Sequence, residues 1–396
     1  MKNFVFHNPT KVIFGPHTVE QIGPETRSLG GKALLVYGRA SAKHSGLYQR
    51  TVTALSQHGV EVVEHGGVSP NPVLHHVREG IGVAKAAKVE VVVALGGGSV
   101  LDTAKAIRAG ALVEHDVWKF FTGKQGIKRV LPLTCIPTLA GAGSEMNSGM
   151  VLTNSDTRQK FGIGNKLLYP NVSILDPETT YSVPPDHTAY GAADAILHLL
   201  EFYFTTRETF TPVQDHFIEG LVSSLMNCGE RALAAPRDYE ARAGLLWGAA
   251  LALCGLSAAG LGRVGFPMHM IEHSLSALYD VPHGAGLTVI APAWMIIQAA
   301  KKPAKFARLA ERVFACDPAL PDAEKARIGI AQLRDWFSRM GCPVNLETLG
   351  IPAADLPLIA ENAQGLARLW RLHDYDQASI MAILQRCRHS QPGEWP

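Results

Sequence analysis

Short apolar runs alternate with helical segments through the first half of this 396-residue chain. Runs that are apolar almost throughout are typical of parallel strands covered on both faces. Their alternation with helices predicts an α/β fold with an open, mostly parallel, Rossmann-like sheet. The expected strands cover residues 12–14, 33–37, 60–63, 89–95, 130–136 and 172–175.

The pattern changes after the dipeptide Pro184-Pro185, where β-branched runs almost disappear and helical segments follow one another. A chain of this length is long enough for two domains with sizeable cores. We therefore expect an α/β dinucleotide-binding domain at 1–185 and an all-α metal-binding and substrate domain at 186–396. The expected helices of the second domain cover 186–203, 211–234, 239–261, 266–279, 284–301, 303–316, 322–340, 352–364 and 375–388.

Charge and cysteine usage narrow the class of protein. The net charge is +2 with no basic block, which argues against a nucleic-acid partner. The N-terminus lacks an apolar signal core, and the longest apolar stretch, 243–261, is too rich in Ala and Gly for a membrane span. The 6 cysteines are scattered without CxxC spacing, so we expect no disulfide framework and no cysteine-based zinc site. These features predict a cytoplasmic protein with no membrane partner.

Two glycine-containing loops follow expected strands. Gly96-Gly97-Gly98-Ser99 lies between a buried strand and a helix, where glycines and free helix N–H groups accommodate a phosphate. A tight turn is the simpler alternative, although two glycines would suffice for it. The second loop, 135–145, contains Thr138 and Ser144, although Ser144 also suits an N-cap. Because ligands of such sheets lie beyond the carboxyl ends of the strands, we expect both loops to line one nucleotide crevice.

The segment after the strand 33–37 bears on the choice of dinucleotide. It contains no G-x-G-x-x-G motif and no carboxylate for a ribose 2′-OH, but offers Arg39, Ser41 and Lys43. Guanidinium groups bind phosphate oxygens in pairs, so this segment favours the 2′-phosphate of NADP(H) over NAD(H). A solvated basic loop is the alternative interpretation.

Polar residues at helical spacing indicate a metal site. Asp194 and His198 are four residues apart in an apolar helical run, as are His269 and His273, and His283 follows after a short turn. Residues four apart lie on one helix face, and buried polar groups need partners. One Asp and two or three His are typical ligands of a divalent transition metal with an open position. With 16 His in the chain, ordinary side-chain hydrogen bonds are the alternative.

Together, these motifs resemble the iron-containing, or group III, alcohol dehydrogenases. The resemblance covers the chain to about residue 300 and is nearest to the NADP-dependent butanol dehydrogenase and broad-range aldehyde reductase branch. It implies a dehydroquinate synthase-like fold with the active site in a cleft between the two domains. The matching segments, in order, are 96–105, 136–145, 175–177, 184–185, 191–198, 267–273 and 282–284.

The resemblance also assigns roles to individual residues. It implies that Fe(II) or Zn(II) is held by Asp194, His198, His269 and His283, and that His273 lies near the nicotinamide and the substrate. It places Asp102 near the nicotinamide ribose, and we expect catalytic roles for His273 and Asp102. Position 39 is Asp in relatives that use NAD. The expected cofactor contacts are Gly38, Arg39, Ser41, Asn71, Gly97, Gly98, Ser99, Asp102, Thr138, Lys160 and Thr180.

The sequence departs from the family pattern at three places. Leu139 and Ala142 stand where many relatives carry Thr. The last ligand motif, 282–286, reads Pro-His-Gly-Ala-Gly rather than Pro-His-Gly-x-Ala-Asn, which leaves the ligand in place but changes the neighbouring substrate wall. The last hundred residues resemble the family only in being helical.

We expect hydride transfer between NADP(H) and a small primary alcohol or aldehyde, with the metal as Lewis acid and His273 as a proton relay. The family also implies a homodimer or a larger homo-oligomer. A maleylacetate-reductase-like or dehydroquinate-synthase-like enzyme on a carboxylated substrate is an alternative that would depend on Arg263. A non-enzymatic nucleotide or metal sensor is the alternative from another class.

Overall fold

The computed structural model describes residues 1–388, which form two compact units. One unit contains His7–Pro184 and Ala234–Gly255, and the other contains Met1–Phe6, Pro185–Leu233 and the described chain from Leu256 onward. The segment 234–255 thus groups with the first half of the chain, although the sequence indicated only another helix of the second half. Compactness does not establish independent folding, so the domain limits 1–185 and 186–396 stay a prediction.

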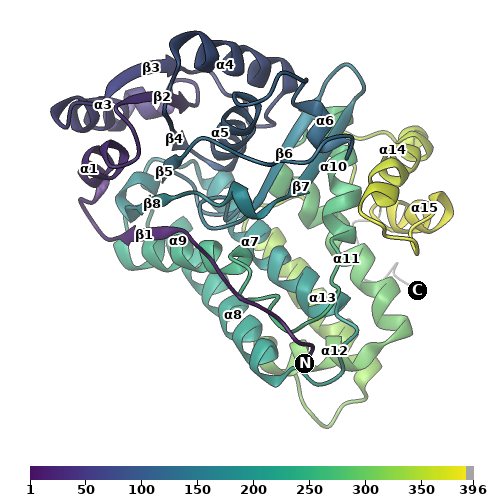
Figure 1. The fold of residues 1–396 in the computed structure, drawn as a ribbon. Helices are drawn as coiled ribbons and strands as arrows, with labels where there is room; N and C mark the ends of the chain where they lie inside the picture. The colour runs from purple at the N-terminus through teal and green to yellow at the C-terminus, as the bar shows by residue number, and fades with distance from the viewer. Residues whose placement is uncertain (389–396) are drawn as a thin grey trace. The chain divides into compact units, whose positions relative to one another are not determined.

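The first unit is built on a parallel sheet of six strands (Figure 1). Each strand pairs with its neighbours in parallel register, for example Leu35 with Val93. This confirms the predicted Rossmann-like α/β architecture. In the order in which they lie across the sheet, the strands are β1 (Lys11–Phe14), β8 (Val172–Leu175), β5 (Leu133–Pro137), β4 (Val91–Gly96), β2 (Lys32–Tyr37) and β3 (Glu61–His65).

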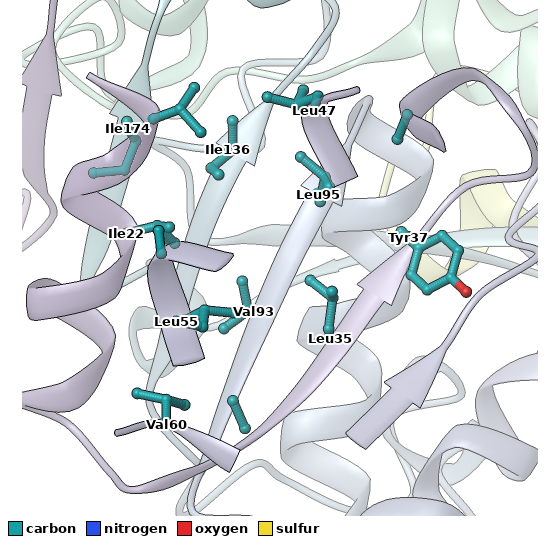
Figure 2. Close-up of a cluster of buried hydrophobic side chains, with 14 of the residues drawn as sticks. Ile22, Leu35, Tyr37, Leu47, Leu55, Val60, Val93, Leu95, Ile136 and Ile174 are labelled. Carbon is teal, nitrogen blue, oxygen red and sulfur yellow. The ribbon is translucent and has the colours of Figure 1, made fainter. Parts of the chain in front are cut away.

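Alternate side chains of the central strands build the core of this unit. Leu35, Val93 and Leu95 point to the face where α1 (Ile22–Arg27) and α3 (Leu47–Gln57) contribute Ile22 and Leu55 (Figure 2). Neighbouring residues of a strand point to opposite faces, so Leu34 and Val92 point to the other face of the sheet. They are also fully buried, which shows that both faces are covered. On that second side lie α4 (Leu74–Ala87) and α5 (Gly98–Gly110), which pack against each other.

An antiparallel hairpin of β6 (Gly149–Asn154) and β7 (Gln159–Gly164) was not predicted from the sequence. It joins the rest of the unit where Thr153 bridges to Val73 and its N–H donates to the Pro72 carbonyl at 2.8 Å. Helix α9 (Tyr239–Leu253) also belongs to this unit, because a Cβ on Gly143 would lie 2.9 Å from the Ala249 carbonyl oxygen. The smaller elements of the unit are α2 (Ser41–His44), α6 (Trp118–Phe121) and short 3-10 turns.

The second unit consists of helices, with no strand among its described residues, as the pattern predicted. Proline starts several of them, because its missing N–H has no partner at a helix start in any case. These helices are α7 (Pro185–Thr205), α8 (Pro212–Ala234), α10 (Pro267–Tyr279), α11 (His283–Lys301), α12 (Pro303–Phe314), α13 (Asp322–Arg339), α14 (Leu356–Leu369) and α15 (Gln377–Arg386).

Helix α11 is the one described helix that is long and apolar enough to cross a membrane, with a mean hydropathy of 1.2. Its best window is already 67% buried by the protein itself, as in a core helix. The stretch 243–261, singled out from the sequence, is not one helix: α9 ends at Leu253, and turns follow it.

Candidate metal centre and nucleotide-binding loops

The four predicted metal ligands converge in the helical unit. Asp194 and His198 lie one turn apart on α7, His269 lies near the start of α10, and His283 is the first residue of α11. The Asp194 Oδ1 atom is 3.6 Å from His198 Nε2, 3.5 Å from His269 Nε2 and 3.7 Å from His283 Nε2. One carboxylate oxygen therefore faces the Nε2 atoms of all three imidazoles.

These donors fit a divalent transition metal. Donor atoms about 2.1 Å from a tetrahedral metal lie about 3.4 Å apart, which is close to the spacings found here. Within the described chain, Asp194 Oδ1 and His269 Nε2 are buried without a hydrogen-bond partner. Such buried orphan atoms are costly unless a ligand satisfies them. The spacing therefore suits a metal-ligand set, and the assignment of these four residues as ligands stays a prediction.

Burial and neighbouring charges shift the ionisation of the cluster. Burial alone would raise the pKa of Asp194, but the imidazoles of His198 and His283 outweigh it and hold that pKa well below its usual range. Burial lowers the pKa of His198 to about 3, which keeps this imidazole neutral and ready to ligate. For His269, burial acts downward, but the carboxylates of Asp194 and Glu201 raise its pKa to about 9. A metal bound by His269 would therefore compete with a proton for this imidazole.

Two buried carboxylates that we did not predict hold two of the imidazoles. Glu201 Oε1 lies 3.2 Å from His269 Nδ1 and accepts hydrogen bonds from the N–H groups of Met268 (2.8 Å) and His269 (3.0 Å). The Glu272 carboxylate bonds to His283 Nδ1. An acceptor at Nδ1 fixes the tautomer and leaves Nε2 free for a metal. The available signal was a Glu three residues after a ligand, His198 or His269, in an apolar helix.

His273 lies beside the ligand set rather than in it. Its buried ring is 5.4 Å from the ring of His283 and 5.5 Å from the indole of Trp370, which meets it edge-on. The Phe266 ring lies edge-on to His269 at 5.4 Å. Aromatic side chains therefore adjoin two of these imidazoles, and Trp370 is one that sequence reasoning missed. Arg263 is exposed and donates to the Arg371 carbonyl at 2.7 Å.

The two glycine loops lie side by side in the first unit. The Thr138 N–H donates to the Gly96 carbonyl at 3.0 Å, and a Cβ on Gly98 would lie 2.7 Å from the Ala142 Cβ. The small residue at 142, a departure from the family pattern, thus packs directly on the first loop. Gly98 begins α5, so free N–H groups are available at this junction as expected.

The loop 69–72 connects the other expected cofactor residues. Its Pro70 carbonyl accepts a hydrogen bond from the Ser99 hydroxyl, and the Oδ1 atom of its Asn71 accepts one from Lys160 Nζ at 3.1 Å. Asp102 is bonded within the protein, accepting from the Ser144 hydroxyl at 2.7 Å and the Val151 N–H at 2.9 Å. The structure thus brings Asn71, Ser99 and Lys160 together.

The remaining predicted cofactor contacts are Thr180 and the segment that starts at Gly38. Thr180 is buried, and its hydroxyl donates to the Pro177 carbonyl at 2.7 Å. The Gly38 carbonyl accepts from the Gly67 N–H at 3.1 Å. Arg39 and Ser41 are exposed. The cofactor roles of these residues stay a prediction.

Two tyrosines, Tyr37 at the end of β2 and Tyr48 on α3, meet Glu64 near the end of β3. Lys43 Nζ lies over the rings of Tyr37 and Tyr48, at 5.1 and 4.7 Å from their centroids. Both tyrosine hydroxyls donate to Glu64, at 2.7 and 2.6 Å. A carboxylate is therefore present at this edge of the sheet, although the sequence segment 38–43 contains none, and two tyrosines already occupy it.

Comparison with known proteins assigns both halves of the chain to one family. The family model for iron-containing alcohol dehydrogenase matches residues 9–177, and the model for the C-terminal part of that family matches 188–387. The chain is 37% identical to NADH-dependent butanol dehydrogenase A of Clostridium acetobutylicum, over 92% of this chain and 93% of that protein. It is 33% identical to the NADPH-dependent aldehyde reductase YqhD of Escherichia coli, over 94% and 96%.

A solved structure extends the likeness to three dimensions. The crystal structure of NADH-dependent butanol dehydrogenase A from Thermotoga maritima is 42% identical to this chain, with a TM-score of 0.94 over 98% of this chain and 99% of that one. The family match reaches residue 387, so the last hundred residues resemble the family in more than their helical content. The chain therefore belongs to the iron-containing alcohol dehydrogenase family, which makes it an oxidoreductase of CH–OH groups that uses a divalent metal and a nicotinamide cofactor.

Proposed function

We propose that this enzyme reduces small aldehydes to primary alcohols with NADPH, at a divalent metal held by Asp194, His198, His269 and His283. The observation that carries the proposal is the convergence of three Nε2 atoms within 3.5–3.7 Å of Asp194 Oδ1, with buried donor atoms left unsatisfied. A bound Fe(II) or Zn(II) ion supplies a Lewis acid for the carbonyl oxygen, and the nicotinamide supplies the hydride.

The protein's own residues orient the reaction. Helix α7 presents Asp194 and His198 from a rigid, buried face, and Glu201 and Glu272 hold the other two imidazoles through Nδ1. The His273 imidazole, buried beside His283, relays a proton to the product oxygen. Asp102 acts through its bonds to Ser144 and Val151, which tie the two loops of the nucleotide site together.

The surroundings of the metal centre favour an uncharged, small substrate. The edges of Phe266 and Trp370 offer apolar contacts next to the imidazoles. Arg263, on which a carboxylated substrate would depend, is exposed and donates to a backbone carbonyl. The names of the relatives point the same way, to butanol and to aldehydes, so we disfavour the maleylacetate-reductase-like and dehydroquinate-synthase-like alternatives.

The preference for NADP(H) depends on the segment after β2. Arg39 and Ser41 are exposed there, and Lys43 is held over two tyrosine rings. The nearby carboxylate of Glu64 is occupied by the Tyr37 and Tyr48 hydroxyls, which leaves it poorly available to a ribose. The butanol dehydrogenase relatives are named for NADH and YqhD is named for NADPH, so the names of the relatives do not decide between the two cofactors. Our proposal of NADP(H) is therefore argued from Arg39, Ser41 and Lys43.

We further propose that the enzyme works in the cytoplasm as a homodimer or larger homo-oligomer. Among the described residues no disulfide joins any of the six cysteines, which suits a reducing compartment. The exposed apolar residues Phe4, Val5 and Phe6 near the N-terminus support self-association.

The test is NADPH oxidation with butyraldehyde after chelation and reloading with Fe(II) or Zn(II), with NADH run in parallel. We expect activity that is lost and restored with the metal and that is faster with NADPH. The variant Arg39→Asp should reverse the cofactor preference, since a carboxylate repels a 2′-phosphate and accepts from a 2′-OH. Turnover that ignores the metal would refute the Lewis-acid role. Binding of metal and nucleotide without turnover of any aldehyde would favour the sensor instead.

A further inference from the structure

The ligand motif departs from its family pattern at Gly286, three residues after His283. A Cβ built on Gly286 would lie 2.8 Å from both Cγ and Oε1 of Glu272 and 3.2 Å from its Cδ. Side-chain carbons do not approach so closely, so any residue other than Gly would force Glu272 to move. Glycine in a helix interior is unfavourable compared with alanine, yet α11 carries one at this contact.

The Glu272 carboxylate occupies the space beside Gly286 and also bonds to the fourth predicted ligand. Glu272 is fully buried, and its carboxylate bonds to His283 Nδ1. Its Oε1 atom also accepts from the Ser276 hydroxyl at 2.5 Å, which holds the side chain on the α10 side. The other nitrogen of His283, Nε2, faces Asp194 Oδ1 at 3.7 Å. The glycine, the carboxylate and the fourth ligand thus form one chain of contacts.

We propose that Glu272 is the positioning residue for His283 and that Gly286 is required to admit it. The inference rests on the metal site proposed above and adds Gly286, whose close contact with Glu272 makes it part of the same arrangement. A methyl group at position 286 pushes the Glu272 carboxylate away from Nδ1, and the imidazole loses both its fixed tautomer and its orientation toward Asp194. Metal affinity then falls although all four ligands are intact.

The two neighbouring glycines have different constraints. A Cβ on Gly284 would lie 2.3 Å from the Tyr190 carbonyl oxygen, a backbone atom that cannot move aside. Gly284 is therefore a packing requirement between α11 and α7, and its substitution tests folding rather than metal binding. At Gly286 the obstructing atoms belong to one side chain, so removing that side chain should remove the obstruction.

A double-mutant cycle tests this coupling. Zn(II) dissociation constants would be measured by competition with a chromophoric chelator for the wild type, Gly286→Ala, Glu272→Ala and the double variant. We expect each single change to weaken binding about 10–100-fold. The double variant should bind within about twofold of Glu272→Ala, because the methyl group then occupies the vacated space. Effects that multiply in the double variant, or a Gly286→Ala protein that binds like the wild type, would overturn the proposal.

Controls separate positioning from general damage. Gly329→Ala creates a similar clash in the same unit, 2.6 Å from the Ala310 Cβ, and should leave the Zn(II) dissociation constant unchanged. Glu272→Gln keeps an acceptor for Nδ1 and should recover most of the affinity that Glu272→Ala loses. The visible spectrum of the Co(II)-loaded protein should change in Gly286→Ala but not in Gly329→Ala, and an unchanged spectrum would count against positioning. If the wild type itself binds no metal, the proposed function fails, not this coupling alone.

Discussion

Substitutions of Glu201 can distinguish an effect on folding stability from an effect on metal affinity. Its Oε1 atom accepts from two N–H groups in the first turn of α10, those of Met268 and His269, and it is fully buried. Leaving a buried donor unsatisfied costs about 1–3 kcal/mol. Glu201→Ala strands both donors and should therefore cost about 2–6 kcal/mol before any cavity term, a large share of the roughly 5–15 kcal/mol that stabilises a domain.

Glu201→Gln keeps an oxygen for the two N–H groups and for His269 Nδ1, but removes the charge. We expect it to fold with a loss of about 1–2 kcal/mol, since hydrogen bonds to charged groups are the stronger ones. Its metal affinity should still fall about 10–100-fold, because the neutral amide supports the His269 imidazole less well as a ligand.

The assay combines urea unfolding of chelated protein with metal competition for the same samples. Glu219→Gln is the matched control, because Glu219 is a buried carboxylate of the same unit that bonds to the Tyr203 hydroxyl at 2.7 Å and to Arg308. It should lose stability without losing metal affinity. Equal metal affinity for Glu201→Gln and the wild type, or an equal loss in both variants, would refute the reasoning.

Three further changes test other parts of the molecule. Asp194→Asn removes the anionic oxygen that faces three imidazoles, so metal affinity should fall by roughly 100-fold or more, as metal analysis after dialysis would show. Trp370→Ala should raise kcat/KM for branched or aromatic aldehydes relative to butyraldehyde by roughly tenfold, whereas Trp247→Ala, a change in the other unit, should not. Burial lowers the pKa of the stacked imidazoles His65 and His76 in the folded protein. As the pH falls, these two imidazoles therefore bind protons more readily in the unfolded chain than in the folded protein. Stability should thus be lost as the pH falls below about 6.5, and His76→Phe should show a smaller drop in melting temperature between pH 7.5 and 5.5.

Local periodicity was sufficient to predict the parallel sheet and the helical second half. The runs around Leu35 and Val93 are buried on both faces, so their sequence is apolar regardless of long-range detail. The β6–β7 hairpin was not predicted, because its turn contains no Asn-Gly or Asp-Gly pair. Instead Arg158 takes the positive φ, at 52°, and the sequence does not indicate that an arginine will adopt this conformation.

The grouping of α9 could not be read from periodicity either. Its sequence specifies an apolar helix, but not which core the helix joins. That depends on a close contact between Gly143, at φ 58°, and the Ala249 backbone, more than a hundred residues away in the chain. A pattern with a period of a few residues contains no information about such a contact.

The sequence was enough to single out the four predicted ligands, whose metal binding stays a prediction, but it did not reveal the carboxylates behind them. Asp194 with His198, and His269 with His273, are paired within one helix turn, so spacing reveals them. Glu201 instead reaches His269 across 68 residues, and Glu272 reaches His283 across a turn between helices. Each Glu looked like one more charge on a helix until the fold placed it against an imidazole.

The charges of the centre explain why these carboxylates belong there. Asp194, Glu201 and Glu272 bring three acidic groups into one buried cluster, where unpaired charge is costly. Without a metal, protons must compensate: the pKa of His269 is raised to about 9, and burial raises that of Glu201 although His269 and two N–H groups act against it. A divalent cation bound by the predicted ligands would replace those protons and give the carboxylates a partner. The same buried charges that are costly without a partner would therefore favour the binding of a doubly charged ion.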